Sequence, residues 1–135
     1  MARGGRLKAT RGHAGAMSRP AFLGQATTEL LTADTGALTV VARGLGAHSI
    51  LGSLVALHCE PQHLVFVLNT TKEEEQLLLH NMAMGGAPRL PAVINNECDA
   101  NERAELYLAG GVLIVTARIL VVDLLSDRVP IEQMT

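Results

Sequence analysis

Short, fully apolar runs alternate along the chain with stretches in which apolar residues recur at helical spacing. Runs that are apolar at successive positions predict strands buried on both faces, and they lie at 37–42, 64–68 and 113–116, with a weaker one at 92–94. Helical spacing occurs at 22–32, 48–59, 72–82, 99–109 and 117–125. This alternation predicts an α/β fold with a parallel sheet and flanking helices, joined by right-handed connections.

Residues that begin and end helices stand at the expected boundaries. Thr70 or Thr71 can cap the helix that starts near residue 72, because three glutamates follow at 73–75, close to the positive helix end. Asp99 and Glu102 have the spacing of a capping box, and Gly110-Gly111 is a typical stop. Thr116 can cap the last helix, 117–125.

Composition restricts the core and the possible partners. Apolar residues make up 48% of the 135 residues and aromatic residues only 2%, so the core is built from aliphatic side chains. The aromatic platforms on which many single-strand binders stack bases are therefore missing. The longest apolar runs fall far short of a membrane span, no signal-peptide pattern follows the first basic residues, and we expect an intracellular protein without membrane contact.

Charge divides the chain into two parts. Residues 1–20 carry a net charge of +5 without any acid, whereas residues 21–135 carry −7. We predict a basic, disordered arm over 1–20 and one domain over 21–135. The arm has three possible interpretations: a nucleic-acid contact, a transit-peptide-like segment, or a solvated tail without a role.

A glycine turn follows the first predicted strand, where α/β proteins often bind phosphate. Gly44 and Gly46 fit such a turn, but Ala47 and His48 stand where a phosphate loop needs Lys and a hydroxyl residue. A tight turn and an atypical nucleotide site both remain open. Cys59 and Cys98 form no ligand cluster with the histidines, so we expect no metal site, no cofactor and no catalytic residues.

Three stretches together carry a family resemblance: 41–47 (VARGLGA), 64–70 (LVFVLNT) and 110–123, which ends in TARILVVD. With 127–130 (DRVP), they resemble the amino-terminal region of the xeroderma pigmentosum group F family of DNA repair endonucleases, from about Leu30 to the end. The resemblance implies the first RecA-like lobe of a superfamily 2 helicase-like module, truncated and without ATPase activity.

The resemblance also implies site residues. The stretch Gly44, Leu45, Gly46, Ala47 and His48 stands where such helicases have their phosphate loop, and it is degenerate here. Leu68–Thr70 and Thr116–Arg118 match motifs that contact the backbone of a single strand in active relatives. We therefore expect a cluster at the carboxyl edge of the sheet that binds single-stranded or junction DNA weakly: Arg43, Asn69, Thr70, Thr116 and Arg118.

The family's other parts have no counterpart in this sequence. The nuclease motif with its Mg²⁺-binding acids and the carboxyl-terminal helix-hairpin-helix pair, which binds the smaller heterodimer subunit, are both absent. The resemblance thus implies a short isoform or fragment, inactive alone, that acts in the nucleus as a DNA and protein docking part for nucleotide excision and interstrand crosslink repair. A nuclease scaffold protein is a possible partner. A small nucleotide-binding α/β enzyme and a non-functional truncated product remain alternatives.

Overall fold

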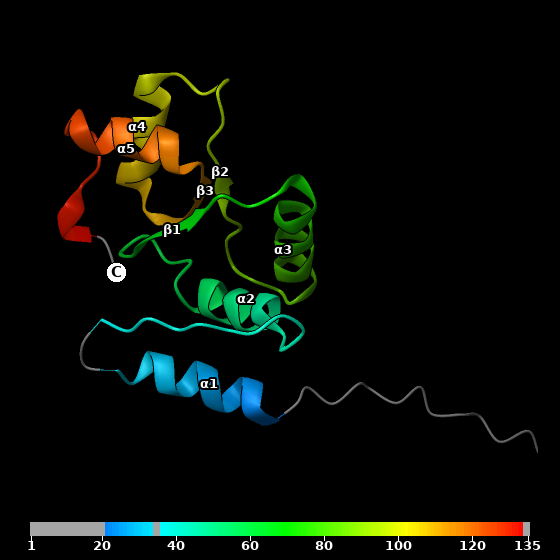
Figure 1. Cartoon of the computed structure of the whole chain (residues 1–135). Coiled ribbons are helices and arrows are strands. Elements are labelled where there is room, and N and C mark those ends of the chain that lie inside the picture. Colours follow the sequence, from blue (N-terminus) through cyan, green and yellow to red (C-terminus); the bar gives the residue numbers. More distant parts are fainter. Residues whose placement is uncertain (1–20, 34–35, 134–135) are drawn as a thin grey trace, which may run out of the picture.

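A three-stranded parallel sheet lies between two layers of helices (Figure 1). The computed structural model describes residues 21–33 and 36–133. The strand order is β1-β3-β2, with β1 at Leu64–Leu68, β2 at Ala92–Val93 and β3 at Gly111–Val115. The helices are α1 (Ala21–Leu31), α2 (Ala47–Leu57), α3 (Lys72–Met84), α4 (Ala100–Ala109) and α5 (Ala117–Leu125), and a 3-10 turn, η1, spans Ile131–Gln133. The predicted class, α/β with a parallel sheet and flanking helices, is confirmed.

The central strand, β3, is buried at every position because it has a neighbouring strand on each side and helices over both faces. Leu64 of β1 pairs with Gly111, and Ala92 of β2 pairs with Leu113. One face of the sheet packs against side chains of α2 and α3, including Val55 and Leu78. The other face packs against α4 and α5, and both cores consist mainly of aliphatic side chains, as the composition predicts.

The helix boundaries follow local chemistry. The Thr71 hydroxyl accepts a hydrogen bond from the Glu74 N–H at 3.2 Å, and the Glu74 carboxylate accepts one from the Thr71 N–H at 2.8 Å, which is a complete capping box. Asp99 accepts from the N–H groups of Asn101 and Glu102, and so begins α4. The chain leaves α4 through Gly110 at a φ of 64°, where a side chain would collide with the carbonyl of Pro61.

The predicted strand at 37–42 is wrong. Residues 36–42 form no strand and lie outside the sheet, which therefore has three strands and not four (Figure 1). The side chains of Leu38 and Val40 are 92% and 87% exposed. A β-branched run favours an extended backbone, but a strand also needs a neighbour to accept its hydrogen bonds, and no strand of the described residues pairs with this one.

The basic arm predicted for residues 1–20 lies outside the described residues. Within those residues, no helix is long and apolar enough to cross a membrane.

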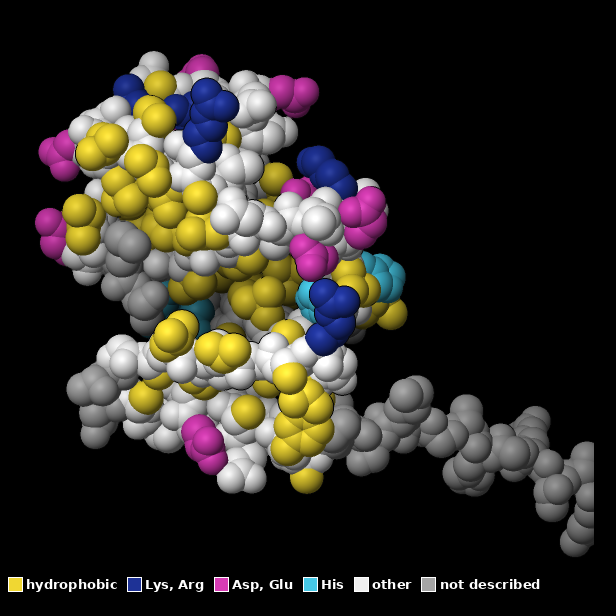
Figure 2. All heavy atoms as spheres, in the orientation of Figure 1, with side chains coloured by type: hydrophobic (Ala, Val, Ile, Leu, Met, Phe, Trp, Pro, Cys, Tyr) yellow, Lys and Arg dark blue, Asp and Glu magenta, His cyan; other side chains and the backbone are white. Residues whose placement is uncertain are grey.

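The unpaired segment 36–42 predicts self-association. Figure 2 shows hydrophobic side chains on the surface of the lower part of the molecule, which contains α1 and this segment. An exposed apolar segment whose backbone pairs with no strand can pair with another chain, so the change Val40→Lys is expected to reduce concentration-dependent association. Sedimentation velocity over a concentration series measures the effect.

The matched control is Gln25→Lys, which adds the same charge at an exposed position of α1. It is expected to leave association close to that of the unchanged chain. Equal reductions by the two variants would mean that net charge, and not the apolar segment, controls association.

Candidate nucleic-acid interface

The three strands end at the same edge of the sheet, and polar side chains follow each of them. Asn69 and Thr70 follow β1, Thr116 follows β3, and Asn95 and Asn96 come shortly after β2. Together these five residues line a groove of about 170 Å³ whose floor is formed by apolar residues such as Ile94 and Val115. We call this hollow the strand-end groove. It presents amide and hydroxyl groups above an apolar base.

Asn69 joins the ends of β1 and β3. Its φ is 56°, a left-handed conformation that asparagine tolerates better than most residues. Its N–H donates to the Val115 carbonyl at 3.4 Å, and its side-chain Oδ1 accepts from the Ala117 N–H at 3.1 Å. The first turn of α5 is thereby fixed against the end of β1. The Thr116 hydroxyl begins the same helix by accepting from the Ile119 N–H at 3.4 Å, as predicted.

Two cationic residues lie at or beside this groove, Lys72 of α3 and Arg118 of α5. Arg118 lines an adjoining open hollow together with Asn95, Asn96 and Thr116. Lys72 lines the strand-end groove itself, but it lies 3.8 Å from the Glu75 carboxylate, which offsets its charge. The structure thus places Asn69, Thr70, Thr116 and Arg118 along one edge, with little net positive charge.

Arg43 does not line either of these hollows. Its expected place depended on a strand at 37–42, and because that strand is not formed, Arg43 lies in the turn that precedes α2. In the predicted degenerate phosphate loop, Gly46 precedes α2 at a φ of 77°. As a glycine, it has no side chain that could cap the helix. His48, in the first turn of α2, lines a separate hollow together with Asn69 and Thr70.

Sequence reasoning missed Asn95 and Asn96. The weak strand at 92–94 was recognised, and the Ile94 N–H does extend its pairing by donating to the Ile114 carbonyl at 2.8 Å. Two asparagines directly after that run are the same signal that singled out Asn69 after β1. The polar residues after 92–94 therefore carry the same signal as those after the other two strands, and by that signal Asn95 and Asn96 are candidate site residues as well.

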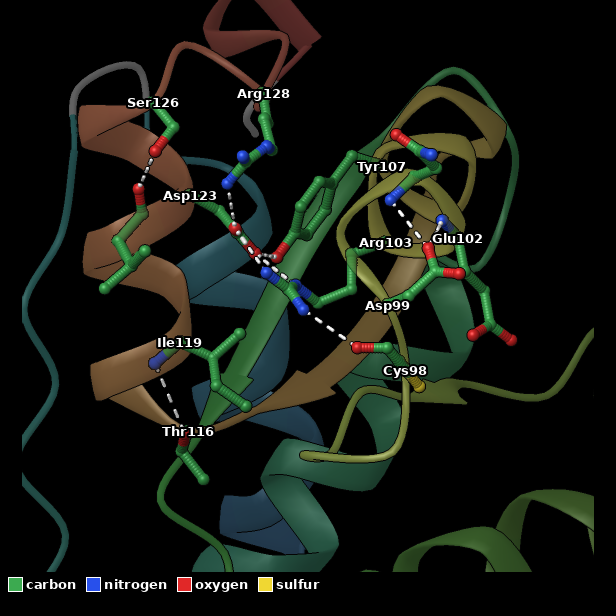
Figure 3. Close-up of polar contacts among 12 residues, drawn as sticks. Cys98, Asp99, Glu102, Arg103, Tyr107, Thr116, Ile119, Asp123, Ser126 and Arg128 are labelled. Atoms are coloured by element: carbon green, nitrogen blue, oxygen red, sulfur yellow. Dashed lines mark hydrogen bonds and ion pairs between the residues drawn. The ribbon is translucent and has the colours of Figure 1, made fainter.

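A buried carboxylate fixes α5 on the sheet. Asp123 is fully buried and accepts hydrogen bonds from Arg103 Nε at 2.7 Å and from the Tyr107 hydroxyl at 2.7 Å (Figure 3). A second Arg103 nitrogen donates to its other oxygen at 2.9 Å, and Arg128 donates there at 3.2 Å. Arg103 also donates to the Cys98 carbonyl at 2.8 Å. We call these residues, Arg103, Tyr107, Asp123 and Arg128, the Asp123 cluster.

The Asp123 cluster shifts the pKa values of three of its members, and that of Arg103 is raised mainly by its hydrogen bonds to Asp123. The Arg103 hydrogen bonds are the main reason that the pKa of Asp123 is lowered to about 2, against the opposing effect of burial. Burial is the main cause that raises the pKa of Tyr107, and its hydrogen bond to Asp123 adds to the increase. Asp123 is therefore held ionised and Tyr107 neutral at neutral pH. The Asp123 cluster supports structure and not proton transfer.

Within residues 21–33 and 36–133, no three His, Cys, Asp or Glu side chains converge as a metal site. Cys59 is buried in the core between the sheet and α2, and desolvation raises the pKa of its thiol. An unreactive thiol is the result.

Comparison with known proteins identifies close relatives. The chain is 44% identical over 111 residues to DNA repair endonuclease XPF of Cricetulus griseus, an alignment that covers 82% of this chain and 12% of that protein. It is 30% identical over 112 residues, or 82% of this chain, to DNA repair endonuclease UVH1 of Arabidopsis thaliana. It is also 30% identical over 115 residues, or 85% of this chain, to DNA repair protein rad16 of Schizosaccharomyces pombe. These two alignments take up 12% and 13% of the relatives. No family model matches the chain.

Over 82% of its length, the chain is similar to a segment of XPF-type DNA repair endonucleases. The resemblance noted in the sequence is thereby confirmed. The chain spans only about 12% of the length of the XPF relatives that it matches.

The change Asp123→Asn is expected to lower the free energy of unfolding by about 3–5 kcal/mol, because it leaves a partly buried guanidinium without its counter-charge. Asp127→Asn is the matched control. It makes the same chemical change four residues later, at an exposed position with a φ of 55° that asparagine also adopts. Urea unfolding followed by circular dichroism gives both values, and similar losses in the two variants would contradict the role of the Asp123 cluster.

The lowered pKa of Asp123 also predicts how stability depends on pH. Because the folded state binds this proton less readily than the unfolded chain, the contribution of Asp123 is complete above about pH 4 and is lost as the pH falls toward 2. We expect ~2 kcal/mol of the difference between the unchanged chain and Asp123→Asn to disappear over that interval. Urea unfolding at a series of pH values tests this, and a difference that stays constant with pH would contradict it.

Proposed function

We propose that the chain is a DNA and protein docking part of an XPF-type DNA repair endonuclease, with a RecA-like, helicase-like lobe that has lost its ATPase. In this role it acts in the nucleus, in nucleotide excision and interstrand crosslink repair. The sequence similarity to DNA repair endonucleases supports the process, and the parallel sheet with flanking helices is compatible with such a lobe. Ala47 and His48 at the start of α2 supply neither the Lys nor the hydroxyl that ATP hydrolysis needs.

The single observation that carries the DNA-binding part is the strand-end groove. Asn69, Thr70, Asn95, Asn96 and Thr116 line one hollow, although they come from three separate strand ends. Amide and hydroxyl groups are common donors to phosphate and sugar oxygens, and such contacts position a strand without reading its sequence. The proposed ligand is single-stranded or junction DNA.

Weak binding follows from the charges at this edge. Arg118 is the cation best placed to neutralise a phosphate, because the Lys72 ammonium is already paired with Glu75. Residues 21–135 carry a net charge of −7, which repels a polyanion. An affinity in the range of non-specific binding, on the order of 10⁻⁴ to 10⁻⁶ M, is expected at physiological salt.

For protein docking, the outward side of α5 supplies an apolar surface. Val121, Val122 and Leu125 are all more than half exposed, although each would be expected to avoid water. This surface supports the proposed contact with a nuclease scaffold protein.

The DNA-binding proposal is tested with Arg118→Ala in the full chain. Fluorescence anisotropy of a labelled single strand, titrated at several salt concentrations, is expected to show weaker binding and a salt slope reduced by about one. Arg89→Ala is the matched control. It removes the same charge beside the amino end of β3, where Arg89 donates to the Ala109 carbonyl at 3.1 Å.

A chain lacking residues 1–20 separates the basic arm from the strand-end groove. If this deletion alone weakens binding, and Arg118→Ala behaves like Arg89→Ala, the groove is not the DNA site.

A further inference from the structure

A second hollow adjoins the strand-end groove, between α2, α3 and the end of β1. It has a volume of about 260 Å³ and shares Asn69 and Thr70 with the groove. Figure 2 shows hydrophobic side chains inside the hollowed region between the sheet-bearing part of the molecule and the part below it. We call this second hollow the side pocket.

The walls of the side pocket are aliphatic. Leu51 comes from α2, Leu68 from the end of β1 and Leu77 from α3. Leu68 and Leu77 line the pocket and are 43% and 45% exposed. A flat apolar ring between these side chains would remove that surface from water.

The remaining lining can form hydrogen bonds. The amide of Asn81 makes no hydrogen bond with any of the described residues, and it stands one helical turn after Leu77. The Glu74 carboxylate accepts from the Thr71 N–H, which is the main reason that its pKa is lowered, and His48 lines the same pocket. Donors and acceptors therefore border an apolar space, as in sites that bind a heterocyclic ring by its faces and its edge.

We propose that the side pocket receives one unstacked nucleobase of the DNA strand whose backbone lies in the strand-end groove. This inference rests on the proposed function. Asn69 and Thr70 line both hollows, so a strand whose backbone lies in the groove passes beside the side pocket. The volume is smaller than the 300–1,000 Å³ that is usual for drug-sized ligands, and it suits a single base. Leucine side chains replace aromatic rings as the surfaces that contact the base faces.

The test uses an adenine-rich single strand that carries one 2-aminopurine, whose fluorescence is quenched by stacking between neighbouring bases. Binding to the full chain is expected to raise this fluorescence, because the base leaves the stack and enters the pocket. Asn81→Phe fills the pocket from an exposed position on α3 and is expected to abolish the rise and to weaken binding about fivefold, the lower part of the range for one base contact.

Gln76→Phe is the matched control, since it also replaces an exposed amide of α3 by a phenyl ring but does not line the pocket. It should leave both signals unchanged. The free 2-aminopurine nucleoside monophosphate distinguishes a strand from a free nucleotide. At the protein concentration that saturates the strand, it should remain unbound, because most of the affinity comes from the backbone.

Three outcomes overturn the inference in distinguishable ways. If anisotropy shows strand binding but the fluorescence does not rise, or if Asn81→Phe behaves like Gln76→Phe, the pocket holds no base while the proposed function stands. A free nucleotide that binds as tightly as the strand would make the pocket a nucleotide site. If the unchanged chain binds no strand at all, the proposed function and this inference fail together.

Discussion

The position of α5 depends on the desolvated carboxylate of Asp123. Burying an ionised group is costly unless every lone pair is used, and here Arg103, Tyr107 and Arg128 supply four donors to two oxygens. Arg103 and Tyr107 belong to α4, whereas Arg128 follows α5, so this carboxylate holds together two helices that cover the same face of the sheet. Because Thr116, directly after β3, caps α5, the geometry of the strand-end groove depends on an interaction near the other end of that helix.

The parts of the fold that are encoded locally could be predicted from the sequence. The strand at 64–68 and the helix at 117–125 have the predicted bounds, because each is delimited by neighbouring polar or capping residues. Thr71, Asp99 and Thr116 cap their helices through bonds that span two or three residues, which a reader of the sequence can recognise. The Asp123–Arg103 contact joins residues twenty positions apart on two helices, and no local pattern indicates it.

The predicted strand at 37–42 shows the limit of this approach. Apolar, β-branched composition indicates that a segment favours an extended backbone, and residues 36–42 carry no helix. It does not indicate whether a neighbouring strand is present. Arg43 was expected at the edge of the sheet because it follows that run, and without the strand it lies in the turn before α2 instead. Asn69, Thr70, Thr116 and Arg118 follow strands that do pair, and their placement at one edge needed only the parallel topology.

The register of the sheet has a consequence for how the chain folds. Leu64 pairs with Gly111, and Ala92 pairs with Leu113. Each strand pair therefore closes a long loop, and neither pair is a hairpin. Loop closure of this kind is entropically expensive before the paired strands begin to stabilise one another, and parallel sheets accordingly fold slowly. During that delay β3, the strand that ends up most deeply buried, has both of its edges unpaired. The success of folding therefore depends on how quickly β1 and β2 pair with these edges, because unpaired strand edges in a partly folded chain promote aggregation as the concentration rises.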